Sequence, residues 1–169
     1  MKKKVLGVLA ALVMSASAGA FANTALGLQG GGVVGFAPGG EFLGGGALGV
    51  TFKMSGIPVV FGGDIYIYSN GRVALGATAD WWVGNPQLAG MLRFFYGLGI
   101  AGGGNALSGN FDSVYAAGRG FGGLNIFVLP TLELYLQMTL QPGAWIKLTE
   151  VHADFDFRLP VNLGFRFWF

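Results

Sequence analysis

The chain has 169 residues, of which 53% are hydrophobic and only 11% are charged, and it contains no cysteine. A disulfide framework and lipoprotein processing are therefore excluded, because both require cysteine. Ten lysine and arginine residues stand against eight aspartate and glutamate residues, but three of the lysines occupy positions 2–4. The remainder is slightly acidic and has no basic patch, so the composition gives no reason to expect nucleic-acid binding.

The first 22 residues have the pattern of a secretory signal peptide. A basic start at positions 2–4 precedes an apolar run over residues 5–13, and Ala20-Phe21-Ala22 fits a small-x-small cleavage site. A spanning helix needs ~20 apolar residues, and this run is shorter. We therefore predict a Sec-type signal peptide over residues 1–22, followed by a single exported domain over residues 23–169.

Eight segments with strand character follow, each bounded by turn residues. Segment 131–141 shows the pattern best, since leucine or methionine occupies its even positions and its odd positions are mostly polar. Alternate positions of a strand lie on opposite faces, so this segment has one apolar and one polar face. Asn70-Gly71 is a strong hairpin signal between two segments. The predicted strands cover residues 25–36, 42–54, 59–68, 72–82, 91–102, 114–128, 131–141 and 159–169.

The less apolar faces of these segments decide the fold class. They hold mainly glycine, alanine and aromatic residues with one or two charges each, which suits a narrow lumen better than a surface in water. We therefore expect the apolar faces to contact lipid and predict an all-β protein, an eight-stranded antiparallel up-and-down transmembrane β-barrel. The alternative is a soluble periplasmic lipocalin-like binder, whose apolar faces would point inward.

An even number of strands places both termini on the same side, which in outer-membrane barrels is the periplasm. The periplasmic turns then carry Pro58, Pro86 and Pro130. Residues 103–113 and 142–156 form the two longer outer loops, which we predict as the surface that meets an extracellular or host protein.

Four residues of the second loop share one face if it is extended, but one histidine among solvated carboxylates is weak support for a metal site. These outer-loop candidates are Glu150, His152, Asp154 and Asp156.

The closing sequence LPVNLGFRFWF places Phe165, Phe167 and Phe169 at alternate positions. This ending resembles the C-terminal signature of bacterial outer-membrane proteins, which the barrel assembly machinery reads. Length and strand number resemble the small eight-stranded barrels of the OmpX and OmpA type. The stretch LPTLELYLQMTLQPG, together with the ending, is also similar to the small outer-membrane barrel family of spirochaetes. These resemblances imply an outer-membrane location, with the lipid bilayer and the assembly machinery as partners, rather than an activity.

Charged residues on the predicted inner faces form the candidate site. A charge inside a narrow lumen is unfavourable unless it is paired, so we expect Glu133 to pair with Arg166 and Asp80 with Arg93. An eight-stranded barrel is barely wide enough for its own side chains, which favours a salt-bridged plug over a gated pore. The predicted lumen charge network is Asp64, Asp80, Arg93, Arg119, Glu133 and Arg166.

The tryptophans divide between the two faces. Alternation predicts that Trp82 and Trp168 fill the periplasmic end of the lumen. Aromatic rings gather at headgroup depth in membrane proteins. The predicted members of these outward belts are Trp81, Tyr96, Trp145 and Phe167.

Catalysis and cofactor binding find little support. The pattern G-x-G-x-x-G occurs from Gly30, Gly97 and Gly118, but no helical periodicity follows any of them, as a dinucleotide fold would require. Ser108, Ser113 and His152 lack the spacing that would define a nucleophile and its base. We predict a non-enzymatic barrel without cofactor, structural or interactive in role; a narrow pore or small-ligand transport barrel is the alternative.

Overall fold

The computed structural model describes residues 23–36, 40, 42–105, 113–148 and 152–169. The predicted signal peptide over residues 1–22 lies outside this part of the chain. Within it, no helix is long and apolar enough to cross a membrane.

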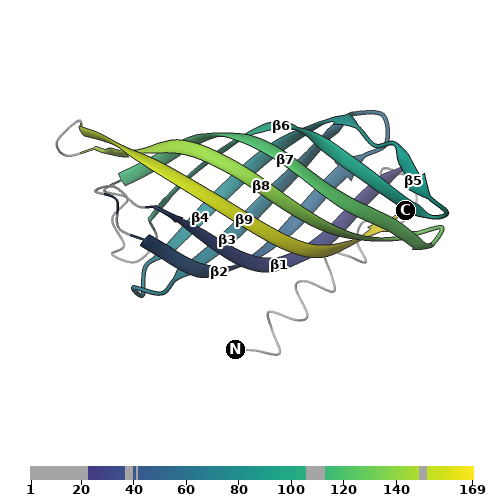
Figure 1. Cartoon of the computed structure of the whole chain (residues 1–169), viewed down its shortest axis with the longest axis horizontal. Coiled ribbons are helices and arrows are strands. Elements are labelled where there is room, and N and C mark those ends of the chain that lie inside the picture. Colours follow the sequence, from purple (N-terminus) through teal and green to yellow (C-terminus); the bar gives the residue numbers. More distant parts are fainter. Residues whose placement is uncertain (1–22, 37–39, 41, 106–112, 149–151) are drawn as a thin grey trace.

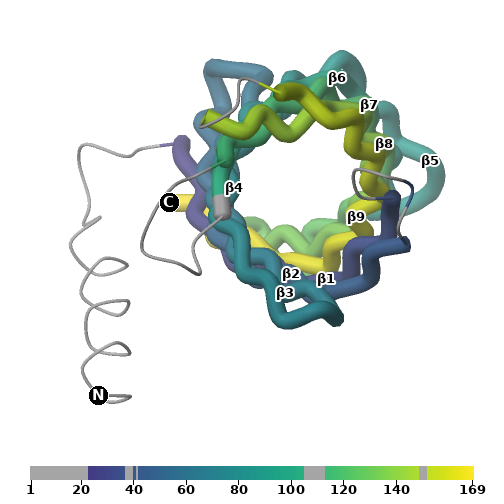
Figure 2. The backbone as a smooth tube through the Cα atoms, turned by 90° about the vertical axis from the view of Figure 1, so that its left-hand side faces the viewer, coloured from purple at the N-terminus to yellow at the C-terminus, as the bar shows by residue number. Residues whose placement is uncertain are grey.

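Eight long strands close into a barrel, as the sequence predicts (Figures 1 and 2). The sheet order is β4-β3-β2-β1-β9-β8-β7-β6-β5, and antiparallel pairing of β4 with β6 completes the ring. The long strands are β1 (Thr24–Phe36), β2 (Phe42–Met54), β3 (Val59–Tyr68), β4 (Val73–Gly84), β6 (Leu92–Asn105), β7 (Ser113–Leu129), β8 (Leu132–Lys147) and β9 (His152–Trp168).

A ninth, short strand was not predicted. β5 (Gln87–Ala89) pairs only with the start of β6, in a stretch where we expected a plain turn. Its cause is a register shift between Trp82 and Gly84, where β4 leaves β6 and frees the first residues of β6 for another partner. Gly90, with φ of +53°, then reverses the chain into β6.

Asn23 and Phe169 meet at one end of the barrel, where the Asn23 amide donates to the Phe169 carbonyl at 2.8 Å. We call this the basal end and the opposite one the distal end. At the distal end, β8 and β9 extend beyond the ends of β1 and β2 (Figure 1).

Polarity is inverted relative to a water-soluble domain, as the sequence predicts. On β8 the odd-numbered Glu133, Tyr135, Gln137 and their successors are buried in the interior. The even-numbered side chains point outward, and Leu140 is 54% exposed. Because alternate side chains point to opposite faces, each strand contributes one apolar outer face and one interior face.

The predicted outer loop over residues 142–156 is wrong. β8 continues through Pro142 to Lys147, and β9 already begins at His152, so most of this stretch is a paired hairpin. Pro142-Gly143 suggested a turn because proline lacks an amide donor for the ladder. In the structure the β7–β8 pairing is interrupted opposite Pro142, between Ala117 and Gly120, so the missing donor falls where the ladder is already open.

The other predicted loop, over residues 103–113, is shortened at both ends. β6 runs to Asn105 and β7 starts at Ser113, while residues 106–112 lie outside the described part of the chain.

Candidate functional site: the polar lumen

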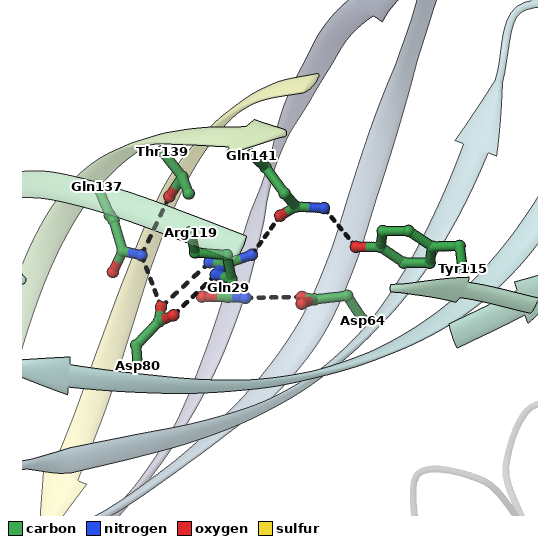
Figure 3. A network of polar contacts seen from close by, with 8 residues as sticks. All are labelled: Gln29, Asp64, Asp80, Tyr115, Arg119, Gln137, Thr139 and Gln141. Carbon is green, nitrogen blue, oxygen red and sulfur yellow. Dashed lines mark hydrogen bonds and ion pairs between the residues drawn. The ribbon is translucent and has the colours of Figure 1, made fainter. Parts of the chain in front are cut away.

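The middle of the lumen is crossed by a network centred on Arg119 (Figure 3). Its guanidinium holds the Asp80 carboxylate through two contacts, Nε to Oδ1 at 2.7 Å and Nη2 to Oδ2 at 3.1 Å. Its Nη1 donates to Gln141 Oε1 at 2.6 Å, and Gln141 in turn donates to the Tyr115 hydroxyl. Gln137 Nε2 donates to Asp80 Oδ2 at 3.0 Å. A two-pronged arginine–carboxylate contact of this kind is among the stronger polar interactions in proteins.

The predicted pairing of Asp80 with Arg93 is wrong. Arg93 lies at the basal start of β6, where its Nε and Nη2 donate to the Asn85 carbonyl at 3.2 and 2.8 Å. In the ladder, Asp80 is opposite Gly99 and Gly99 is opposite Arg119, so Arg119 approaches Asp80 across a strand that has no side chain at that level.

The contact across Gly99 is one case of a general arrangement. Residues two strands apart are about 9.6 Å apart in the backbone, and long side chains can meet only if the intervening position is small. Three further hydrogen-bonded pairs are separated by one glycine: Gln29 and Asp64 by Gly49, Gln29 and Tyr135 by Gly164, and Thr51 and Arg166 by Gly27. At these four positions, glycine therefore lets polar side chains meet across an intervening strand.

A second branch of the network connects Tyr135 to Asp64. The Tyr135 hydroxyl donates to Gln29 Oε1 at 2.9 Å, and Gln29 Nε2 donates to Asp64 Oδ1 at 2.6 Å. Asp64, a predicted member of the network, is 4% exposed and bonds to a neutral amide rather than to a cation. Neutral lumen residues were not predicted as network members; those found are Gln29, Tyr115, Tyr135, Gln137, Thr139 and Gln141.

At the basal end, the ion pair predicted between Glu133 and Arg166 is present. Arg166 Nη1 lies 3.3 Å from Glu133 Oε1, and both side chains are 1% exposed. Asn125 Nδ2 and Trp168 Nε1 also donate to Glu133, at 2.8 and 3.1 Å. The Arg166 guanidinium lies 3.9 Å from the centroid of the Tyr135 ring.

Lys53 was not predicted as a lumen residue, yet it belongs to the same end. Its Nζ lies 3.2 Å from the centroid of the Trp82 ring and 5.8 Å from that of Trp168. Trp82 stacks on Phe95 with 4.3 Å between ring centroids. Trp82 and Trp168 therefore lie at the basal end of the lumen, as predicted from the alternation.

The distal end holds an ion pair that the sequence analysis missed. Arg158 pairs with Asp156, and both side chains are 2% exposed. The guanidinium lies 4.2 Å from the centroid of the Tyr115 ring, 5.3 Å from that of Trp145 and 5.7 Å from that of Tyr68. Continuous alternation of β9 would have revealed both charges, because Asp156, Arg158 and Asn162 share the inner face.

Two further predictions at this end are wrong. Asp156 is a buried lumen residue rather than part of an outer loop, because β9 begins earlier than expected. Trp145 packs against the interior cluster rather than an outward belt, because β8 continues past Pro142 and places Trp145 opposite the buried Tyr115.

The remaining loop candidates do not form a metal site within the described residues. His152 Nε2 lies 3.0 Å from Asp154 Oδ1 at the exposed start of β9. Glu150 lies outside the described residues. Across the described ranges, no group of three or more His, Cys, Asp or Glu side chains is arranged to hold a metal ion.

Phe165 and Phe167 lie on the outer face of β9 at the basal end, and Phe169 directly follows the strand. The rings of Phe165 and Phe167 meet edge to face with 5.7 Å between centroids. All three line an apolar groove on the outside of the barrel that also includes Phe52 and Phe61. Trp81 and Tyr96 point outward as well, and are 58% and 42% exposed.

No protein-family model and no curated protein matches the chain. Among solved structures, it is similar to Neisserial surface protein A, with a TM-score of 0.56 and 13% identity over 88% of this chain and 98% of that one. It also matches the N-terminal β-barrel domain of Pseudomonas aeruginosa OprF, with a TM-score of 0.49 and 18% identity over 86% and 98% of the two chains. A de novo designed transmembrane β-barrel matches with a TM-score of 0.44 and 11% identity, over 88% and 97%.

The likeness to Neisserial surface protein A confirms the predicted resemblance to small eight-stranded bacterial barrels at the level of the fold. The similarity to the spirochaete barrel family stays a prediction.

Proposed function

We propose that this protein is an integral β-barrel of the bacterial outer membrane, with a plugged lumen and a structural or surface-interaction role. The observation that carries the proposal is the inversion of polarity. Leu98, Ile100 and Leu163 on the outer face are 66%, 68% and 64% exposed, whereas Glu133 and Arg166 inside are 1% exposed. Such an apolar exterior is unfavourable in water but is what a bilayer requires of a spanning barrel.

Export fits the predicted signal peptide over residues 1–22, which would leave residues 23–169 as the barrel. The outward position of Phe165, Phe167 and Phe169 is compatible with recognition by the barrel assembly machinery, our proposed partner during insertion. The distal rim is the proposed surface for an extracellular or host protein, because it would face outward when the basal end faces the periplasm.

Three contacts support a plug over a pore or a transport barrel. Asp80 and Arg119 fill the middle of the lumen, Glu133 and Arg166 the basal end, and Asp156 and Arg158 the distal end. Each of these six side chains is less than a tenth exposed. Each of the six charges therefore has a counter-charge beside it, which also favours a protein without catalytic activity.

Fractionation and conductance test both parts of the proposal. We expect the protein in the outer-membrane fraction, with heat-modifiable gel migration and no stepwise conductance in planar bilayers. Recovery as a detergent-free periplasmic monomer would refute the membrane location. Stepwise conductance of the wild-type protein, absent from a mock preparation, would replace the plug by the narrow-pore alternative.

A further inference from the structure

The basal end of the lumen holds more positive than negative charge within the described part of the chain. Lys53 lies within electrostatic reach of Arg166, Arg93 and Glu133. Glu133 is already engaged by Arg166, Asn125 and Trp168. Arg93 contacts the neutral carbonyl of Asn85. The single carboxylate of Glu133 therefore cannot compensate the positive charges of Lys53, Arg93 and Arg166. We call Lys53, Trp82, Arg93, Glu133 and Arg166 the basal cluster.

The basal cluster also has hydrogen-bond donors that no described residue satisfies. The Lys53 ammonium makes no hydrogen bond or ion pair with a described residue and rests on the faces of Trp82 and Trp168. Trp82 Nε1 and Arg166 Nη1 are buried and donate no hydrogen bond to a described residue, although Arg166 Nη1 lies 3.3 Å from Glu133 Oε1 as an ion pair; the two side chains are 7% and 1% exposed. A ring face attracts a cation but offers no lone pair to accept an N–H hydrogen bond, so the Lys53 and Trp82 donors remain available.

Both cations lie near the ring of Trp82. The Arg166 guanidinium lies 5.5 Å from the centroid of the Trp82 ring, and Lys53 Nζ lies over the same ring at 3.2 Å. Lys53 is only partly buried, so this member of the cluster is reachable from the basal mouth. A buried donor without an acceptor costs ~1–3 kcal/mol, which a bound acceptor would recover.

We propose that the basal cluster binds a small oxyanion, a phosphate or a carboxylate group, that enters from the periplasmic mouth. An oxyanion matches the excess positive charge and offers several acceptor oxygens to the Lys53, Trp82 and Arg166 donors. Chloride carries a negative charge but lacks the separate acceptor oxygens that could receive hydrogen bonds from donors in fixed positions. Asn125 Oδ1, an unpartnered acceptor beside Glu133, would additionally receive the proton of a hydrogen phosphate. The site goes beyond the proposed function, and its failure would leave the plugged barrel intact.

Thermal unfolding of the full-length barrel in a neutral detergent tests the site, with sodium phosphate titrated against sodium chloride at equal ionic strength. A ligand that binds only the folded state raises the unfolding temperature in a concentration-dependent way. We expect phosphate to raise it above the chloride control and acetate to raise it less, since acetate offers fewer oxygens. Tryptophan emission should change over the same phosphate range, because Trp82 lies at the site.

Three variants give the test its controls. Lys53→Met should weaken phosphate binding at least ten-fold, whereas Lys53→Arg keeps the cation and should retain it even if the methionine variant folds poorly. Arg72→Gln removes an exposed cation from the turn between β3 and β4, at the other end of the barrel, and should change nothing. Equal responses of the wild type to phosphate and chloride, or a phosphate response unchanged in Lys53→Met, would overturn the proposal.

Discussion

Each end of the lumen contains an arginine–carboxylate pair beside aromatic rings, but the two ends differ in net charge. At the distal end Arg158 has its own carboxylate, Asp156, and three aromatic rings around the guanidinium. At the basal end Arg166 also has a carboxylate and an aromatic ring, but Lys53 lies nearby without an acid of its own. Both ends can therefore be closed by packing, while among the described residues the excess of positive charge that would attract an anion lies at the basal end.

The comparison predicts that Glu133→Ala has the largest effect on stability. The change removes the carboxylate that faces Arg166 and Lys53, and leaves two cations close together. Loss of one partner from a buried ion pair costs ~3–5 kcal/mol, and partial hydration of the lumen would reduce this figure. Urea unfolding in detergent measures it.

A double-mutant cycle separates pairing from simple loss of packing. Adding Arg166→Ala to Glu133→Ala should cost less than the sum of the two single changes, since the second removes a cation already left without its partner. Strict additivity would contradict a functional ion pair at the basal end. Arg72→Ala, on an exposed turn, serves as the surface control and should stay within ~0.5 kcal/mol.

Asp156→Ala should be the second-largest change. It leaves Arg158 buried without a carboxylate, but the rings of Tyr115, Trp145 and Tyr68 still stabilise the guanidinium. A cation–π contact contributes ~0.5–1 kcal/mol at an exposed site and ~2 kcal/mol at a desolvated one. We therefore expect a loss of stability of about 2–3 kcal/mol, below that of Glu133→Ala. The same unfolding experiment ranks the two variants, and the reverse order would show that the distal pair carries more of the stability.

The middle of the lumen, between these ends, depends on backbone spacing. A Cβ at Gly99 would overlap the Asp80 carboxylate and the Ala79 carbonyl, so Gly99→Ala should displace Arg119 as well. We expect a loss of ~1–3 kcal/mol, the usual effect of overpacking. Gly118→Ala is the matched control on β7, since a Cβ there meets nothing within 4 Å, and its unfolding midpoint should stay near that of the wild type. Equal midpoints for the two variants would mean that Gly99 does not set the spacing.

Sequence alternation was sufficient for the barrel and for the inner position of the six charges of the predicted network, because a period of two needs no long-range information. Alternation could not predict which charged side chains pair with each other across the lumen. Whether Asp80 meets Arg93 or Arg119 depends on strand register, and a difference of a few residues along β6 and β7 changes the pair. The glycine opposite each polar crossing was a usable signal, since Gly99 stands between Asp80 and Arg119 in the ladder.

The distal pair was missed for a different physical reason. Pro142-Gly143 is typical of a turn, so the predicted outer loop started at Pro142 and included Asp156. Proline is tolerated inside β8 because the neighbouring ladder is open at that level, a tertiary feature that no local pattern contains. Lys53 was missed because β2 is rich in glycine, so its alternation is weak and its inner face hard to assign.

Lys53→Met should have the smallest effect on stability, although Lys53 is central to the proposed anion site. The change removes the attraction to Glu133 and the cation–π contact with Trp82, but it also removes repulsion with Arg166 and Arg93. These contributions oppose each other, so in phosphate-free buffer we expect a change within ~1 kcal/mol of the wild type in either direction. Urea unfolding at low and high sodium chloride measures it. If repulsion contributes, the variant should gain most over the wild type at low salt, where screening is weak. A large loss of stability at every salt concentration would instead show that Lys53 stabilises the plug itself, through the contact of its ammonium with Trp82 and Trp168, and would argue against a role in anion binding.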